Sequence, residues 1–394
     1  MLLFLGRSPR ILTFTIACFF SLLLLSGCTN VTPQPAPTNP RTFLSNLTVE
    51  FLDEYHILDT SFQDTKIGGL SAINYDPRRG VFYALSDDRS NFDPARFYEL
   101  SIKLDEAGVI PQIESVNFEK IVTLTDAEGN SFSRGTIDPE GLSLSPRNSL
   151  FIASEGVTKQ QINPFVKEFN LNGQEIDNLR IPERFLPLSD EQGVQDNLGF
   201  EALSLSTPSI APEDPFRLFV APESSLTQDN SPENISQPIR FLHYVINPIG
   251  NPVLIGEHLY PLEPTPEGVV ANGLVELIAL PKEGYLLSLE RTYGLGGAGA
   301  KLFQTTIGNA TDTSRIESIP ELADTITPMQ KTLLFDLRTI GIGLDNLEGM
   351  TLGPKLADGS QSLVLISDNN FSENQVNQVL LFRLSKSAAN STSK

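Results

Sequence analysis

The sequence predicts an all-β protein whose single folded domain is a β-propeller of five or six blades. A strand-turn-strand pattern recurs along the chain at nearly equal steps, which is typical of propeller blades. No segment carries a long apolar pattern with the helical period of about 3.6 residues. The 28 Gly and 28 Pro residues among 394 indicate many turns. A large β-sandwich or barrel is the alternative, and the equal steps favour the propeller.

The recurring unit opens with a short motif and leads into an apolar strand that ends in charge. The motif occurs as GGLS, EGLS and EALS, with weaker copies NGLV and EGMT, at residues 68–71, 140–143, 201–204, 272–275 and 348–351. The acids at the ends of the following strands are Asp88, Glu155, Glu223, Glu290 and Asp368, at steps of 67, 68, 67 and 78 residues. Each step allows one blade with long loops, and residues 44–58 and 113–124 can supply further strands.

Composition excludes several classes of function. Lys and Arg total 28 against 48 Asp and Glu, so the net charge is −20 and nucleic-acid binding is not expected. Two Cys and three His residues are too few for a disulfide framework or a Cys-rich zinc site.

The N-terminus is typical of a bacterial lipoprotein signal peptide, residues 1–27. Two arginines precede an apolar stretch at residues 11–25, which is short for a membrane span. The following LSGC segment resembles a lipobox, so we expect export and lipidation of Cys28. A plain signal peptide with a chance Cys is the alternative. The protein is therefore expected at the cell envelope, anchored to a membrane on its periplasmic or extracellular side.

The composition divides the remaining chain into three parts. Residues 28–46 are a Pro-rich linker, residues 47–384 are the propeller domain, and residues 385–394 are a disordered tail. We expect a monomer.

The acidic strand ends predict a metal site. Equivalent strand ends of a propeller meet around one mouth of its channel, where so many carboxylates repel each other unless a cation is present. Oxygen ligands without His or Cys favour Ca²⁺, or Mg²⁺ with retained waters. The predicted metal ligands are Asp88, Glu140, Glu201, Glu290, Glu348 and Asp368.

Four arginines lie beside these acids or on the strands that follow them: Arg89, Arg96, Arg240 and Arg291. Their guanidinium groups can pair with the acids or hold an anionic substrate.

Several segments resemble the phytase-like family, also called esterase-like activity of phytase. The segments are GGLSAINYD, FYALSDDR, ARFYEL, DPEGLSLS, FIASEG, GFEALSLS, LLSLER, NLEGMTLGP and LVLISDNN, within residues 66–384. The resemblance implies an exported bacterial β-propeller that hydrolyses phosphoesters or other esters. In alkaline phytases, which have a similar architecture, carboxylates hold Ca²⁺ ions that bind phosphate and activate water.

The resulting hypothesis is metal-assisted hydrolysis of a small anionic ester. Ca²⁺ would lower the pKa of an attacking water, Glu155 or Glu223 would act as general base, and Arg89 and Arg291 would orient the anion. Three alternatives stay open. The acids can cap strands or pair with arginines, the protein can be a non-catalytic propeller that binds a ligand or partner, or it can be a metal-dependent propeller lactonase.

Overall fold

In a computed structural model, the described residues are 47–206, 211–230 and 237–386. Within them the chain forms five four-stranded antiparallel sheets and one two-stranded hairpin. The signal peptide, Cys28, the linker and most of the predicted tail lie outside the described residues. The described chain contains no helix long and apolar enough to cross a membrane.

The five sheets are the blades of a propeller, which confirms the predicted fold class and fixes the blade number at five. Blade 1 contains β4 (Leu70–Asp76), β5 (Val81–Ser86), β6 (Arg96–Asp105) and β7 (Gln112–Thr123). Blade 2 contains β8 (Pro139–Leu144), β9 (Ser149–Ser154), β10 (Phe165–Asn170) and β11 (Glu175–Asn178). Blade 3 contains β12 (Phe200–Ser206), β13 (Phe216–Pro222), β14 (Pro238–Ile246) and β15 (Val253–Pro261).

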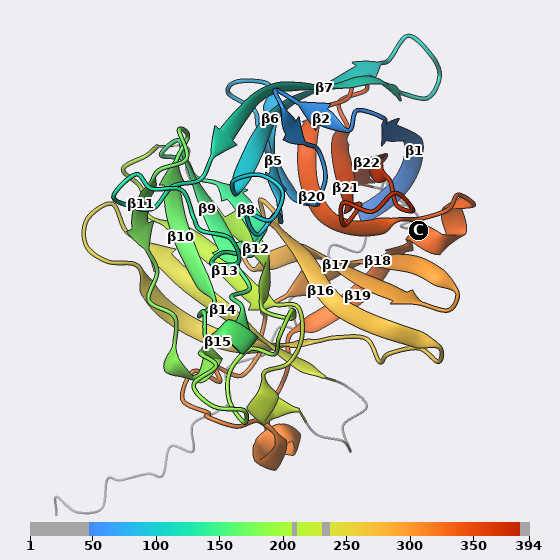
Figure 1. Cartoon of the computed structure of the whole chain (residues 1–394). Coiled ribbons are helices and arrows are strands. Elements are labelled where there is room, and N and C mark those ends of the chain that lie inside the picture. Colours follow the sequence, from blue (N-terminus) through green and yellow to red (C-terminus); the bar gives the residue numbers. More distant parts are fainter. Residues whose placement is uncertain (1–46, 207–210, 231–236, 387–394) are drawn as a thin grey trace, which may run out of the picture. The chain divides into compact units, whose positions relative to one another are not determined.

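The last two blades complete the ring. Blade 4 contains β16 (Val269–Ala279), β17 (Tyr285–Gly294), β18 (Gly297–Thr306) and β19 (Gln330–Asp336). Blade 5 contains β20 (Asn346–Lys355), β21 (Gln361–Asp368), β22 (Asn377–Lys386) and β1 (Leu47–Ile57). The first strands β4, β8, β12, β16 and β20 contact one another in a closed ring around the axis (Figure 1).

Short elements occupy the connections between these strands. The hairpin consists of β2 (Ser61–Phe62) and β3 (Thr65–Lys66). The helical turns are all 3₁₀: η1 (Thr158–Gln160), η2 (Glu183–Phe185), η3 (Thr227–Asp229), η4 (Pro320–Thr325) and η5 (Leu337–Ile340).

Blade 5 joins the two ends of the domain. β1 pairs antiparallel with β22, from Leu47 opposite Lys386 to Ile57 opposite Asn377. Phe51 and Phe382 reinforce this pair with ring centroids 5.5 Å apart. Because β22 continues to Lys386, the two residues that follow Leu384 are strand residues and not part of a disordered tail.

The apolar core lies between neighbouring blades. In β5, Phe82 and Ala84 pack between blades 1 and 5, whereas Tyr83 and Leu85 pack between blades 1 and 2. Successive side chains of a strand point to opposite faces, and here both faces are buried. This explains why the strands read as nearly continuous apolar runs in the sequence.

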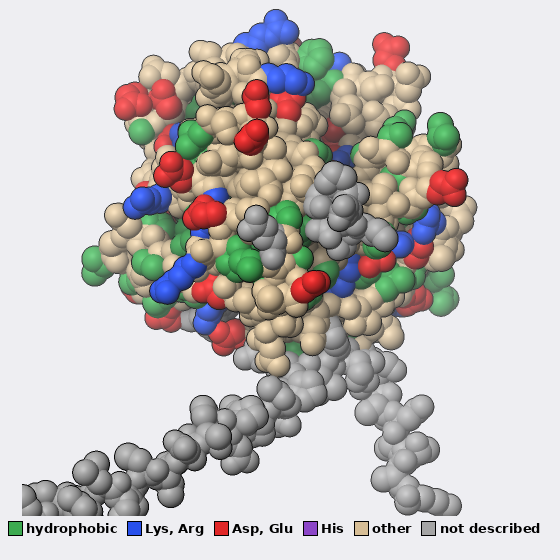
Figure 2. All heavy atoms as spheres, turned by 90° about the horizontal axis from the view of Figure 1, so that it is seen from below, with side chains coloured by type: hydrophobic (Ala, Val, Ile, Leu, Met, Phe, Trp, Pro, Cys, Tyr) green, Lys and Arg blue, Asp and Glu red, His purple; other side chains and the backbone are tan. Residues whose placement is uncertain are grey.

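The acidic surplus is not gathered on the face that Figure 2 presents. Asp and Glu side chains are interspersed there with Lys and Arg (Figure 2). Many of the other acids are buried, including Glu155, Glu201 and Glu223.

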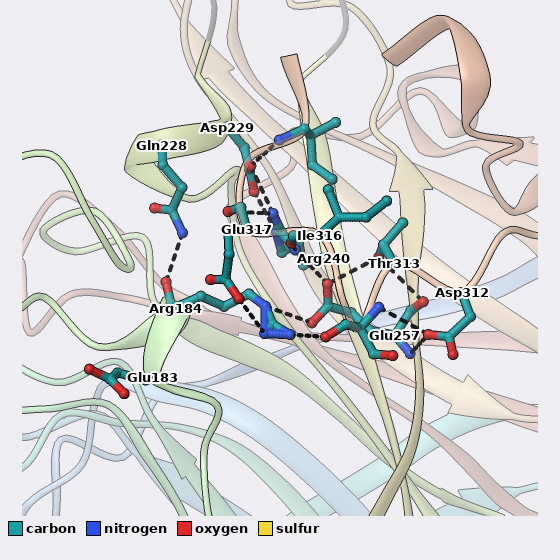
Figure 3. A network of polar contacts seen from close by, with 12 residues as sticks. Glu183, Arg184, Gln228, Asp229, Arg240, Glu257, Asp312, Thr313, Ile316 and Glu317 are labelled. Atoms are coloured by element: carbon teal, nitrogen blue, oxygen red, sulfur yellow. Dashed lines mark hydrogen bonds and ion pairs between the residues drawn. The ribbon is translucent and has the colours of Figure 1, made fainter. Parts of the chain in front are cut away.

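Arg240 belongs to a buried ion network in blade 3, so its predicted role in substrate binding is wrong. Its guanidinium is fully buried and contacts Asp229 of η3 and Glu257 of β15, at 2.5 and 2.6 Å (Figure 3). It also donates to the carbonyl oxygens of Ile316 and Glu317, at 2.7 and 3.0 Å. The network therefore holds the segment between β18 and β19 against blade 3.

We predict that Arg240→Ala destabilises the domain by about 3–5 kcal/mol, because Asp229 loses its guanidinium partner and Glu257 keeps only the longer contact with Arg184. Arg338→Ala is the matched control, since the Arg338–Asp336 pair is exposed and its loss should cost less than about 1 kcal/mol. Urea unfolding measures both values. Equal effects of the two substitutions would show that the buried network does not carry this stability.

Candidate functional site

A cavity of about 410 Å³ lies where the innermost strands meet, and its lining is strongly acidic. Seven carboxylate side chains and two guanidinium groups line it. The acids are Asp87, Glu140, Glu155, Glu201, Glu223, Glu348 and Asp368, and the arginines are Arg89 and Arg291. We call this cavity the axial pocket.

One residue at the end of each second strand contributes to the pocket. The backbone N–H groups of Asp87, Glu155 and Glu223 donate to the residue that precedes the inner strand of the same blade. Arg291 and Asp368 lie at the corresponding register, opposite Gly273 and Asn346. These five residues are 68, 68, 68 and 77 positions apart. The repeat therefore places a guanidinium in blade 4 where the other four blades have a carboxylate.

A second set of acids enters the pocket from bulges in the inner strands. The register of blades 2, 3 and 5 shifts by one residue at Glu140, Glu201 and Glu348. A bulge leaves one residue unpaired and turns its side chain away from the regular alternation. The corresponding bulge residues of blades 1 and 4 are Ser71 and Val275. Three of the five bulges thus supply a glutamate.

The carboxylate of Glu223 needs a glycine in the neighbouring blade. A Cβ atom at Gly273 would lie 2.2 Å from Oε1 of Glu223, far inside contact distance. This glycine is therefore required for close packing of the side chain and not for a turn.

Arg291 ties three blades together across the pocket. Its Nη2 donates to Glu223 at 2.7 Å and its Nη1 to Glu348 at 2.7 Å. Asn346 donates from Nδ2 to the same Glu348 oxygen at 2.8 Å. Arg291 therefore neutralises part of the acidic ring.

Arg89 lies on the opposite part of the lining and is better exposed. Its Nε donates to Asp138 and one terminal nitrogen donates to Asn197, both at 2.6 Å. The Asp138 carboxyl is buried, and no N–H or hydroxyl group among the described residues donates to its other oxygen, whose neighbours are the carboxyl groups of Glu140 and Glu155. Asp87 likewise has a buried oxygen without such a donor.

The carboxylates form two triads that share Glu155. The oxygens of Asp138, Glu140 and Glu155 lie within 4.8 Å of one another, and so do those of Glu155, Glu201 and Glu223. A cation held by three oxygen ligands needs this proximity. Each triad can therefore hold a metal ion, and Glu155 can be a ligand in either triad.

Burial raises the pKa of most of these carboxyl groups. It brings the pKa of Asp138 to about 6, although Arg89 opposes the shift. The pKa of Glu348 is about 7 with Arg291 opposing, and that of Asp368 is about 8 with Glu348 adding repulsion.

Four more pocket acids have pKa values that are shifted in the same direction. Burial first, and then neighbouring carboxylates, raise the pKa values of Glu140, Glu155 and Glu201 well above their ordinary range. Asp87 behaves in the same way beside Asp368. The metal-free pocket therefore retains protons at neutral pH.

Asp88 and Glu290 are not part of the ring, so this part of the predicted ligand set is corrected. Asp88 accepts from Arg96 at 2.8 Å and from three backbone N–H groups of its own loop. Glu290 accepts from Lys331 and from the Tyr260 hydroxyl, on the side of β17 away from the pocket. In both places the neighbouring residue, Asp87 or Arg291, faces the axial pocket.

Arg96 is also not available to a substrate. It is buried and donates to Asp88, to the Tyr98 hydroxyl and to the Lys66 carbonyl oxygen, at 2.6–2.8 Å. The other predicted residues, Arg89, Arg291, Glu140, Glu155, Glu201, Glu223, Glu348 and Asp368, all line the axial pocket.

Sequence reasoning missed several lining residues. Asp87 was detectable, because aligning the apolar strands places it level with Glu155 and gives equal steps of 68 residues. Asp138, which belongs to one triad but does not line the pocket, was detectable only as the acid two residues before the EGLS motif. Asn197 and Tyr293 lie in a loop and at the end of a long strand, where no repeated pattern marks them.

The chain matches one family of known proteins over most of its length. The family is phytase-like, described as esterase-like activity of phytase, and the match covers residues 65–371. No curated protein matches the chain.

Solved structures are similar at low identity. A member of the GH130 family of mannoside phosphorylases is 13% identical over 88% of this chain and 92% of its own, with a TM-score of 0.38. The Malassezia sympodialis allergen Mala s 1 is 11% identical over 82% and 97%, also with 0.38. The Bombyx mori GH32 β-fructofuranosidase BmSUC1 is 10% identical over 88% and 66%, with 0.36. Likeness at this level carries no argument about activity.

We predict that the metal-free protein loses stability between pH 6.5 and 8.5. Glu348 and Asp368 bind more protons in the folded than in the unfolded state over this range, so raising the pH favours unfolding. The melting temperature in chelator should fall by at least about 3 °C. The window avoids His243, whose lowered pKa of about 4 makes stability rise with pH below about 6.5.

Glu201→Gln provides the control for this measurement. It removes one ionisable carboxyl group from the pocket, and with it the charge that this group acquires as the pH rises, so it should raise the melting temperature at pH 8.5 more than at pH 6.5. A melting temperature that is constant or rises across the window in chelator would contradict the electrostatic description of the pocket.

Proposed function

The chain belongs to the phytase-like family, and we propose on this premise and on the geometry of its axial pocket that it is a metal-assisted hydrolase of small anionic esters, phosphoesters first. The observation that carries the proposal is the pair of carboxylate triads sharing Glu155, with Arg89 and Arg291 in the same pocket. A cavity that concentrates oxygen ligands beside guanidinium groups suits a cation and an anion bound together.

The donor set supports a hard cation. All the triad ligands are carboxylate oxygens, and Asp138 contributes one buried oxygen to which no N–H or hydroxyl group of the described residues donates. Ca²⁺ fits this set best because it accepts several carboxylates in flexible geometry, and Mg²⁺ is the second choice. When bound, the ion would supply charge neutralisation for the ester and a lowered pKa for a bound water.

The arginines would bind the anionic part of the substrate. Arg89 makes hydrogen bonds through two of its three nitrogens to the described residues, and a third of its side chain is exposed to the pocket side. Arg291 is held in place by Glu223 and Glu348. Such fixed guanidinium groups can stabilise the charge that develops on an ester oxygen without reorganisation.

Glu155 would accept a proton from the attacking water. Its Oε1 accepts from the Gly199 N–H at 2.8 Å, which fixes the side chain at the junction of both triads. Burial and the neighbouring Asp138 and Glu223 raise its pKa, which makes the ionised Glu155 carboxylate a stronger proton acceptor than an ordinary glutamate. Glu223 is the second candidate for this role and already carries the ion pair with Arg291.

We also propose that the protein is exported, anchored to a membrane through Cys28, and monomeric. The lipobox-like LSGC segment and the preceding apolar stretch support the first two points. An acidic pocket with ester chemistry at the cell envelope would have access to extracellular Ca²⁺ and to small soluble esters.

We predict that Glu155→Gln lowers kcat on p-nitrophenyl phosphate at least about 100-fold, because the variant loses its proton acceptor and a shared metal ligand. The assay is run on the chain from residue 30 onward, with Ca²⁺ or with chelator, and repeated with p-nitrophenyl acetate and phytate. Wild-type activity should depend on Ca²⁺.

Glu168→Gln is the matched control, since Glu168 is a buried glutamate of the same blade that accepts from Ser149 outside the axial pocket. Its activity should stay within twofold of wild type. Activity that is indifferent to chelator would remove the metal from the proposal. Absence of turnover on every ester, together with a melting temperature raised by Ca²⁺, would favour a binding protein.

A further inference from the structure

A second hollow of about 340 Å³ adjoins the axial pocket. Asp87, Arg89, Asn197 and Asn370 line both, so they form a common wall. On its outer side the hollow adds two aromatic residues, Phe92 and Phe371. We call this hollow the rim groove.

The two phenyl rings form one apolar platform. Their centroids lie 4.7 Å apart with an interplanar angle of 35°. Phe92 is 57% exposed, which is unusual for a large apolar side chain beside a polar pocket. The platform therefore offers an uncovered ring surface next to Arg89.

Lys66 fixes the position of both rings. Its ammonium nitrogen lies 4.3 Å from the centroid of Phe92 and 5.3 Å from that of Phe371. The same nitrogen donates to the Phe371 carbonyl oxygen at 3.2 Å. Cation–π contacts and this hydrogen bond hold the platform in place before any ligand arrives.

The backbone of the loop is strained where it presents Phe371. Asn370 and Phe371 have φ angles of 48° and 51°, in the left-handed region that bulky residues rarely adopt. Asn369 compensates by accepting from the N–H groups of Gly69 and Phe371, at 3.1 and 3.0 Å. A Cβ atom at Gly68 would lie 2.7 Å from the Phe371 ring, so a glycine is needed where the ring packs. Strain that the surroundings maintain in this way is typical of binding sites.

The charge in the groove suits an anion bound nearby. Asp88 also lines it, but its carboxylate is neutralised by Arg96 and by backbone N–H groups. Lys66 places a positive charge over the rings of the platform, and Arg89 places one in the common wall. An ester that contacts Arg89 with its anionic group would therefore extend its other end over the rings.

We propose that the rim groove binds the alcohol portion of the substrate and selects a ring with an apolar face, either an aryl group or a saturated ring. This inference rests on the proposed function, because that function is what identifies the group beside Arg89 as the anionic part of an ester. Stacking on Phe92 and Phe371 supplies the selectivity, and the common wall at Arg89 sets the distance between ring and anion.

The test uses phosphonates, which cannot be hydrolysed as esters. Calorimetry on the Ca²⁺-loaded wild-type chain compares phenylphosphonate, cyclohexylphosphonate and methylphosphonate. The phenyl compound should bind about tenfold tighter than the methyl compound. Phe92→Ala should abolish this difference, whereas Leu188→Ala, at an equally exposed site outside the groove, should keep it.

The cyclohexyl compound identifies the kind of ring. Affinity equal to that of the phenyl compound supports a saturated ring as natural ligand, and weaker affinity supports an aryl group. Equal binding of all three compounds, or a difference that survives Phe92→Ala, overturns the proposal.

Hydrolysis measured in parallel separates this inference from the proposed function. If no ester is turned over but the Phe92-dependent difference in affinity is present, the groove assignment stands and the hydrolase assignment falls. Suppose that phenyl phosphate and methyl phosphate are both hydrolysed, and that the kcat/KM for each substrate is the same in Phe92→Ala as in wild type. The hydrolase assignment then stands and the groove assignment falls.

Discussion

Repulsion among buried carboxylates is the constraint on which the rest of this structure depends. Seven acids line one axial pocket against two arginines, and burial makes each additional negative charge costly. The fold tolerates this because the acids are carried by strand ends and bulges of a closed ring, which cannot separate to relieve the repulsion. Arg291 lies at the one ring position without an acid and contacts glutamates of two other blades. Protons or a cation must supply the remaining positive charge.

The blade architecture could be predicted from the sequence more completely than the residues of the candidate site. Apolar strands that recur every 68 residues predict blades, because each strand is buried on both faces between two neighbours. The bulge glutamates were also accessible, since they are part of the repeated motif. The choice between Asp87 and Asp88 required an exact alignment of the strands, because successive residues of a strand point to opposite sides and a shift of one position exchanges them. In blade 4 the prediction was also wrong by one position, so that Glu290 was predicted where Arg291 lines the pocket.

The arginines show why residue type alone does not identify a site. Arg96 and Arg240 both lie on the third strand of a blade, and each pairs with an acid in the loop that precedes that strand, Asp88 or Asp229. This ion pair holds the loop against the blade. It also buries two guanidinium groups that the sequence analysis assigns to substrate binding. Arg89 lies just after the second strand of blade 1 and Arg291 lies within the second strand of blade 4, and both line the axial pocket because of this place in the topology.

The pairing of β1 with β22 has a consequence for biosynthesis. Thr48 and Ser385, which face each other in the closing blade, are separated by 337 positions. β1 therefore has no native partner until β22 has been synthesised, and such long-range contacts form slowly. Blade 5 also carries Glu348 and Asp368, so the acidic ring is assembled only in this late folding step. The seven carboxylates of the axial pocket therefore lie together only after blade 5 has closed.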